Sequence, residues 1–352
     1  MRTAIGLVAC LSLAAFVQAL SPLAGVGPEA GMAREAKAFL ASLPDEARAR
    51  ALIPFDDPER ADWHYVPRER RGVRIGDLAG EPRERLDALL RSALSRSGQE
   101  KVEGILGLER VLFELESRPD APATWRDPGN YFVAVFGDPE RDGPWGWCIE
   151  GHHLSLHFTC VGERTLSVTP HFLGAAPLSV PDWRGSGEAF LVLGSEETRA
   201  REFLAALAPE LRALAVRDGR PPEEILLVPE TRADSLAREG LTLESLGADG
   251  RQRFFDALAE FAYHLRPELA DPELERARST DAAELSFLWI GSTKPGDPFY
   301  FRLQGPSFVV EYENGRPGAD HVHSVWRDPR NDFGEDTLRA HLARDHAGAR
   351  ER

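Results

Sequence analysis

A short alternation of apolar and polar residues near the middle of the chain constrains its fold most strongly. Leu154, Leu156 and Phe158 are separated by single polar positions. Because successive side chains of a β-strand point to opposite faces, this spacing predicts a half-buried strand whose polar face carries His153 and His157. We therefore expect a sheet with one face packed on a core and the other face polar and bearing histidine.

Helical and β-rich segments alternate along the rest of the chain. Residues 28–116 have mainly helical spacing, whereas residues 131–170 and 284–326 contain apolar and aromatic runs separated by turn residues. The stretch 170–187 is expected to be a loop. Blocks of helices and strands in this order predict an α+β fold, in which a mostly antiparallel sheet with flanking helices forms a single large domain over residues 20–352.

The N-terminus is typical of a secretory signal peptide. Residues 1–19 combine one early arginine with an apolar run and small residues before the expected cleavage after Ala19. Anchoring as a lipoprotein at Cys10 is the less favoured alternative, because little apolar sequence precedes that cysteine. No later apolar run has the length of a membrane span. We therefore expect a secreted or periplasmic protein with no stable membrane insertion after cleavage.

The charge of the chain limits its partners. There are 42 Lys and Arg residues against 57 Asp and Glu residues, and the formal net charge is −15. A nucleic-acid partner requires a basic face on the protein, so this balance argues against one. The expected partner is a small-molecule substrate or ligand.

Two cysteines, Cys148 and Cys160, lie beyond the expected cleavage point. Along one continuous strand their Cα atoms would be about 40 Å apart at roughly 3.3 Å per residue, which excludes a disulfide. A disulfide requires the chain to turn back between them, most simply at Gly151 or in the pair of histidines that follows it. Two buried thiols are the alternative.

A second histidine pair, His321 and His323, lies near the C-terminus. Side chains two positions apart in a strand project from the same face, so both imidazoles can reach one ion. Three neutral imidazoles and a water are a known arrangement for catalytic zinc. His153 and His157 would lie about 13 Å apart along a strand, so only one of them can join the ion. We prefer His153 as the third ligand and keep His157 as the alternative. The expected cofactor is a divalent transition metal, zinc or copper.

Other residues in the two histidine blocks are candidates for catalysis or for the wall of a pocket. Glu150 or Asp328 can act as a proton acceptor, or as the carboxylate behind a ligand histidine. Arg327 can hold a carboxylate or phosphate through two hydrogen bonds. The expected pocket residues are His152, Trp145, Trp147 and Trp326. Burial in the core is the alternative for these residues, and hydrogen-bonded structural histidines are the alternative to a metal site.

Several short segments of the sequence resemble those of a known bacterial family. The most distinctive are Gly151-His-His-Leu-Ser-Leu156 and His321-Val-His-Ser-Val-Trp-Arg-Asp328, together with Tyr300-Phe-Arg-Leu-Gln-Gly-Pro306. In these segments the chain is similar to the domain of unknown function 3500 family, a group of uncharacterised secreted proteins. The resemblance covers most of the chain and implies a secreted, single-domain protein. It implies no activity, because none has been assigned to the family.

Two functional hypotheses follow. The first is a secreted metal-dependent enzyme, a hydrolase, in which a histidine-built site holds the ion. The second is a non-catalytic periplasmic or extracellular binding protein for a small polar ligand or a transition metal. Acid-base catalysis without a metal is a third possibility. The chain lacks the Gly-x-Ser-x-Gly, Gly-x-x-x-x-Gly-Lys and His-Glu-x-x-His motifs of serine hydrolases, nucleotide enzymes and zinc proteases.

Overall fold

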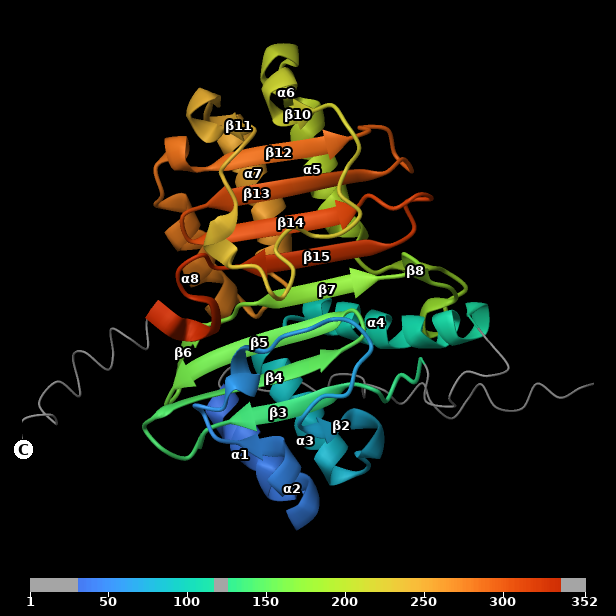
Figure 1. Ribbon diagram of the computed structural model, residues 1–352, viewed down its shortest axis with the longest axis vertical. Helices are drawn as coiled ribbons and strands as arrows, with labels where there is room; N and C mark the ends of the chain where they lie inside the picture. Colours follow the sequence, from blue (N-terminus) through green and yellow to red (C-terminus); the bar gives the residue numbers. More distant parts are fainter. Residues whose placement is uncertain (1–30, 117–125, 337–352) are drawn as a thin grey trace, which may run out of the picture.

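A large mixed sheet forms the centre of the structure, a computed structural model that describes residues 31–116 and 126–336 (Figure 1). Seven of its strands lie in the N-terminal half: β1 (Leu52–Ile53), β2 (Val73–Arg74), β3 (Phe132–Phe136), β4 (Pro144–Gly151), β5 (Leu154–Val161), β6 (Arg164–Ser167) and β7 (His171–Ala175). The other strands are β10 (Val216–Arg217), β11 (Leu241–Thr242), β12 (Ser286–Gly291), β13 (Phe299–Gly305), β14 (Phe308–Asn314) and β15 (Val322–Arg327). In space they follow the order β1-β3-β4-β5-β7-β15-β14-β13-β12-β10, and β2, β6 and β11 pair beside this path.

Eight α-helices accompany the sheet within the described residues. They are α1 (Met32–Ser42), α2 (Asp45–Ala51), α3 (Glu81–Ala93), α4 (Arg96–Leu115), α5 (Gly194–Ala206), α6 (Pro209–Ala215), α7 (Ala248–Ala262) and α8 (Pro267–Arg278). A separate two-stranded ladder, β8 (Ser179–Val180) with β9 (Phe190–Leu191), links the halves. Because all the strand pairs except β1 with β3 and β10 with β12 are antiparallel, the predicted α+β fold with a mostly antiparallel sheet is confirmed.

The two halves of the sheet are built from the same succession of elements. Each half has two helices and a two-residue strand, then a long segment, a second two-residue strand and two more helices. Each then ends in an antiparallel series, β3-β4-β5-β7 in the first half and β12-β13-β14-β15 in the second. The last strands of the two series, β7 and β15, pair with each other and join the halves. The sequence has no repeat of fixed period, so this duplication is visible only in the structure.

The helices pack on one face of the sheet, the helix face, and the long segments 54–72 and 218–240 cross the other, the loop face (Figure 1). Leu154, Leu156 and Phe158 belong to the large core under the helices, as their alternation predicts. A smaller core lies under the long segments and consists of Trp63, Tyr65, Phe172, Ile225, Leu227, Val309, Val325 and Phe333. The polar face expected for β5 is therefore covered by loops.

A buried carboxylate anchors each long segment to the sheet. Glu150 of β4 accepts a hydrogen bond of 3.0 Å from the backbone N–H of His64. Glu311 of β14 accepts two hydrogen bonds, each 2.8 Å long, from the backbone N–H groups of Leu226 and Leu227. Since buried backbone donors require partners, these carboxylates fix where the two segments cross the sheet.

The stretch 170–187, predicted to be a loop, contains the strand that joins the halves. β7 occupies residues His171–Ala175 and pairs with both β5 and β15. Its five residues lie between Pro170 and Pro177 and include a glycine, a composition more typical of loops than of a central strand. Pairing on both edges outweighs this weak local preference.

Cys148 and Cys160 are free and buried. The chain does turn back between them, at His152 and His153, but the two thiols point to opposite faces of the sheet. Cys148 packs with Ile53 and other residues of a small cluster on the loop face, whereas Cys160 belongs to the core under the helices. Of the two alternatives for these cysteines, the structure has the pair of buried thiols.

No helix within residues 31–116 and 126–336 has the length and apolar character that crossing a membrane requires. The predicted signal peptide, residues 1–19, and Cys10 lie outside the described residues.

Candidate metal centre

His153 lies in the two-residue turn of the β4–β5 hairpin. Its φ of 61° is in the left-handed region, which residues other than glycine rarely adopt. The backbone N–H of His153 donates to the carbonyl of Tyr65 (2.9 Å), and its carbonyl accepts from the backbone N–H of Gly174 (2.7 Å). These two bonds hold the residue in a conformation that costs roughly 1–2 kcal/mol for an L-amino acid. Backbone strain of this kind is concentrated at functional sites.

Gly174 makes room for the His153 ring. A Cβ atom at position 174 would lie 2.9 Å from Cδ2 and 3.0 Å from Cγ of His153. Across the sheet, Gly174 pairs with His323 of β15. A glycine in the central strand thus lets an imidazole from the β4–β5 turn approach the start of β15.

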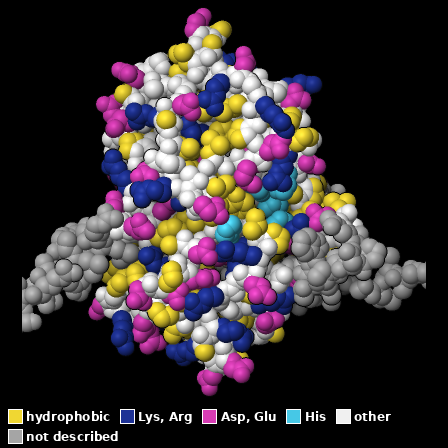
Figure 2. Space-filling view, in the orientation of Figure 1, with side chains coloured by type: hydrophobic (Ala, Val, Ile, Leu, Met, Phe, Trp, Pro, Cys, Tyr) yellow, Lys and Arg dark blue, Asp and Glu magenta, His cyan; other side chains and the backbone are white. Residues whose placement is uncertain are grey.

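His321 and His323 come from the start of β15, in the second half of the sheet. His321 directly precedes the strand and is partly exposed, whereas His323 is buried and packs against the rings of Tyr65 and Phe172. As predicted for positions two apart, both imidazoles project on the same side. Figure 2 shows histidine side chains gathered at the molecular surface beside lysine or arginine and acidic side chains.

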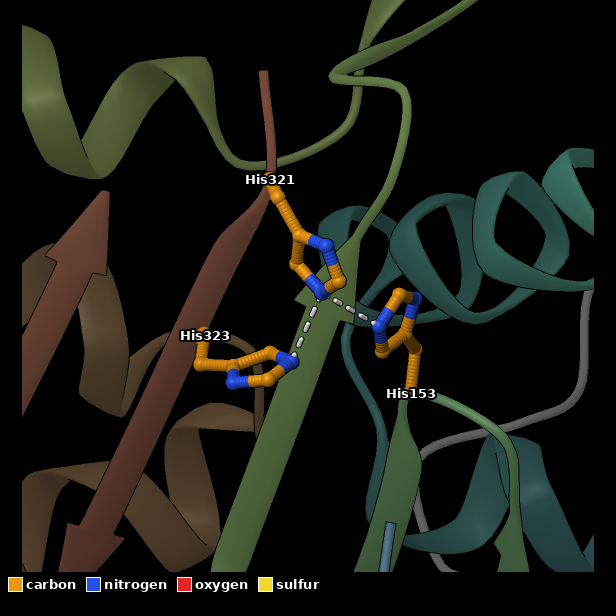
Figure 3. A group of neighbouring side chains, drawn as sticks. All are labelled: His153, His321 and His323. Atoms are coloured by element: carbon orange, nitrogen blue, oxygen red, sulfur yellow. Dashed lines mark hydrogen bonds between the residues drawn. The ribbon is translucent and has the colours of Figure 1, made fainter. Parts of the chain in front are cut away.

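The three imidazoles converge through their Nε2 atoms (Figure 3). Nε2 of His321 lies 3.0 Å from Nε2 of His153 and 3.0 Å from Nε2 of His323. Among the described residues these three form a group whose ligand atoms all lie within 4.8 Å of one another. The structure therefore brings together the predicted pair and the preferred third histidine, although about half of the chain separates them.

The three imidazoles are kept neutral by their surroundings. Burial, followed by the neighbouring histidines, holds the pKa of His153 well below its usual value. Burial, His323 and Arg316 lower the pKa of His321 to about 2. Burial also lowers the pKa of His323, against the opposing effect of Glu224. Neutral imidazole is the form that ligates metals.

The spacing of the three nitrogens fits a transition-metal ion. Nitrogens bound at about 2.0–2.1 Å in tetrahedral geometry lie about 3.3 Å from one another, close to the two separations of 3.0 Å found here. The structure thus contains a group that can hold a metal ion, with three histidine ligands and a partly exposed side at His321.

Two charged residues contact the outer nitrogens of the C-terminal pair. Glu224 accepts a hydrogen bond of 2.5 Å from Nδ1 of His323, which is the usual carboxylate partner of a ligand histidine. Burial alone would raise the pKa of Glu224, but the hydrogen bond with His323 and the nearby charges outweigh it, so the pKa is lowered. On the other side, Nη1 of Arg316 lies 2.9 Å from Nδ1 of His321.

A wide-open surface cavity of about 630 Å³ adjoins these two residues. Glu224 and Arg316 line it together with Pro222, Glu223, Ile225, Leu226 and Val228. Behind Glu224 lies Glu313, which is fully buried, and burial raises its pKa to about 8. Its Oε2 has no hydrogen-bond partner among the residues that the structure describes, and lies 4.0 Å from Nδ1 of His323. The candidate centre therefore has an adjoining space large enough for a small molecule.

His157 and Glu150, predicted as a possible ligand and as a proton acceptor, form a separate buried group. Oε1 of Glu150 accepts from Oγ of Ser155 (2.7 Å) and from the backbone N–H of His64, and lies 3.2 Å from Nε2 of His157. Its other oxygen is 3.8 Å from Nε of Arg70. Both oxygens of Glu150 are thus engaged with neighbouring groups, two of which belong to the long segment 54–72, and neither Glu150 nor His157 belongs to the group of three imidazoles.

Arg327 and Asp328 are also engaged in structural contacts. Arg327 forms an ion pair of 2.5 Å with Asp332 and its guanidinium lies over the ring of Trp63. Asp328 forms an ion pair of 3.1 Å with Arg276. These contacts tie β15 to the loop face and to α8, and neither residue belongs to the histidine group.

The predicted pocket residues pack away from the histidine group, except for His152. Trp145, Trp147 and Trp326 are buried in the core on the helix face. His152 stacks on His153 with 3.8 Å between ring centroids and pairs with the buried carboxylate of Glu109. The three tryptophans are on the core side because their positions alternate with those that face the loops.

Sequence reasoning missed Glu224, Arg316 and the cavity. Glu224 lies in the segment 218–240, where no hydrophobic periodicity indicates which side chains point inward. Arg316 lies in the loop between β14 and β15, five residues before His321. Its proximity to His321 in sequence was the one available signal.

Comparison with known proteins gives a family but no described activity. The family described as "Protein of unknown function (DUF3500)" matches residues 27–335, nearly the whole chain. No curated protein and no solved structure matches the chain. The match includes both histidine blocks and every residue of the candidate centre, and the chain therefore belongs to the DUF3500 family of unknown function.

Proposed function

We propose that this protein is a secreted, metal-dependent enzyme, and that its reaction is a hydrolysis. The observation that carries the proposal is the convergence of three neutral imidazoles, in which Nε2 of His321 lies 3.0 Å from Nε2 of each of the other two, beside a cavity that Glu224 and Arg316 line. His153, His321 and His323 are the ligands. A divalent ion in such a site lowers the pKa of water and polarises a substrate carbonyl or phosphoryl group.

Glu224 is the proton acceptor in this proposal and replaces Glu150 in that role. Its carboxylate bonds to Nδ1 of His323, lines the cavity and is 36% exposed, so it is accessible to water and substrate. Its lowered pKa keeps it ionised near neutral pH. A carboxylate behind a ligand histidine also orients the ring and makes it a better ligand.

The test is metal analysis of the purified mature protein, expressed without a histidine tag. We expect one equivalent of zinc or copper to remain after dialysis, and to be lost in His323→Ala and in His321→Ala. His64→Asn is the matched control, because its ring lies outside the histidine group and pairs with Glu230 at the surface. A wild-type protein that binds no stoichiometric metal, or variants that retain it, would refute the metal centre.

Cobalt substitution separates an enzyme from the alternative, a non-catalytic binding protein. A catalytic ion keeps an open coordination position, whereas a storage or structural ion does not. We expect azide to shift the visible bands of the cobalt protein, and Glu224→Gln to abolish hydrolysis while cobalt stays bound. Bands that do not respond to azide would favour the binding protein.

A further inference from the structure

The hydrogen bonds around His321 and His323 have a fixed direction. Arginine can only donate, so Nδ1 of His321 must accept the bond of 2.9 Å from Arg316. A neutral imidazole carries a single N–H, which places the hydrogen of His321 on Nε2. At the other end, ionised Glu224 can only accept, so His323 carries its hydrogen on Nδ1 and presents a lone pair at Nε2.

These assignments form one continuous series of donors and acceptors. Arg316 donates to His321, the Nε2–H of His321 faces Nε2 of His323 and Nε2 of His153, each 3.0 Å away, and His323 donates to Glu224. In this arrangement His323 is ready to bind a metal through Nε2, but His321 is not, because its Nε2 is occupied by hydrogen.

We propose that Arg316 holds His321 in the tautomer that cannot bind a metal, so that metal binding requires Arg316 to leave Nδ1 of His321. This inference rests on the proposed metal centre and adds a positioning residue that sets its affinity. When an ion occupies Nε2 of His321, the hydrogen of the ring lies on Nδ1 and faces the guanidinium. Two donors cannot share that contact, and Arg316 moves away.

The surroundings of Arg316 give it somewhere to move. Its side chain is 37% exposed and lines the adjoining cavity. Its other contacts are weak: Nε lies 3.2 Å from the carbonyl of Glu223, and Nη2 lies 3.4 Å from Glu224. Loss of one hydrogen bond to a charged group corresponds to an affinity change of about 10- to 100-fold. Removing Arg316 should therefore tighten metal binding by about tenfold or more.

The test combines two measurements on the full mature protein. The first is ¹⁵N NMR of histidine-labelled protein, in which His321→Gln identifies the signals of His321. We expect the hydrogen on Nε2 in zinc-free protein and on Nδ1 after zinc is added. The second is competition for zinc with a chromophoric chelator. Arg316→Met and Arg316→Gln should both bind zinc about tenfold more tightly than the wild type, and a merely structural role of Arg316 predicts weaker binding instead.

Arg232→Met is the matched control, because Arg232 pairs with Asp234 at the surface and does not line the cavity. Its zinc affinity should equal that of the wild type. A hydrogen on Nδ1 of His321 in the zinc-free wild type, or Arg316 variants that bind zinc no more tightly, would overturn the inference and leave the metal centre intact. Absence of zinc binding in the wild type and in both Arg316 variants would instead refute the metal centre itself.

Discussion

Gly174→Ala tests the packing that places His153 in the centre. The added Cβ would lie 2.9 Å from Cδ2 and 3.0 Å from Cγ of the imidazole. Ordinary carbon contacts are about 3.5–4.0 Å, so the ring must retreat by roughly 0.5–1 Å. The backbone cannot share this shift, because His153 is held by hydrogen bonds to Tyr65 and Gly174. The ring must rotate away from its present position.

The displacement exceeds what a metal site tolerates. Ligand distances in metal sites lie within about 0.2 Å of their ideal values, so a retreat of 0.5 Å or more removes His153 as a ligand. Disturbing even an outer contact of a ligand typically lowers affinity by about 10–100-fold, and we expect at least this loss of zinc affinity in Gly174→Ala. Competition with a chromophoric chelator measures it.

The stability of the same variant provides an independent check. Overpacking costs about 1–3 kcal/mol, and removing a glycine from a strand returns about 0.5–1 kcal/mol. We therefore expect the free energy of unfolding of Gly174→Ala to fall by about 1–2 kcal/mol. In a His153→Gly background the clash is absent, and the same substitution should stabilise the protein by about 0.5–1 kcal/mol. Urea unfolding followed by tryptophan fluorescence measures all four proteins. An equal effect of Gly174→Ala in both backgrounds would refute the proposed contact.

Three further predictions concern groups outside the histidine centre. Glu196 is fully buried with Lys101 (2.9 Å) and His264 (2.7 Å), and although burial opposes it, these partners lower the pKa of Glu196 to about 2. Because this pKa lies below the usual value of 4.5, the stabilisation is complete above about pH 4.5 and is lost as the pH falls toward 2. Glu196→Gln should therefore lower the free energy of unfolding by about 3–5 kcal/mol at pH 7. In urea titrations at pH 3 the difference from the wild type should be smaller. A difference in the free energy of unfolding that does not change with pH would contradict the ion pair. Glu150→Gln leaves buried Arg70 without its opposite charge and should lower the free energy of unfolding by about 3 kcal/mol. Its zinc affinity should equal that of the wild type. A large loss of zinc affinity would instead show that Glu150 belongs to the metal centre. Burial raises the pKa of the Cys148 thiol well above its usual value and that of the Cys160 thiol to about 12. A thiol reagent should therefore modify both only after unfolding, and thiols undetectable without a reductant would indicate a disulfide.

The alternation of side chains along β5 allowed the core side of the strand to be predicted, whereas His153, expected on the polar face of that strand, lies in the turn that precedes it. The period of two identified the core side of β5, and the His-x-His pair identified two side chains on one face of β15. The turn that lets the chain fold back between the two cysteines also explains why His153 can leave the strand and approach β15.

The parts of the site that the sequence did not predict are set by the two long segments and by which side chains those segments bury. Glu150 and His157 looked like site residues because they lie beside the histidine block in sequence, but the segment 54–72 covers that face and occupies them. Glu224 lies in the corresponding segment of the second half and reaches the centre only because Glu311 anchors its neighbours, Leu226 and Leu227. Contacts between segments far apart in sequence leave no periodic signal in either one.

The two halves of the sheet have the same architecture, but they contribute differently to the histidine site. The β4–β5 turn, which carries His153, has its counterpart in the β13–β14 turn, where Pro306 and Ser307 stand. If the two halves were identical, each of these turns would form an equivalent corner beside the pair of strands β7 and β15. Of the two, the corner at the β4–β5 turn holds the imidazole cluster. If the chain descends from a shorter ancestor that paired with its own copy, fusion freed the two copies to diverge. Of the two corners, one now carries the imidazole cluster and the other a proline and a serine.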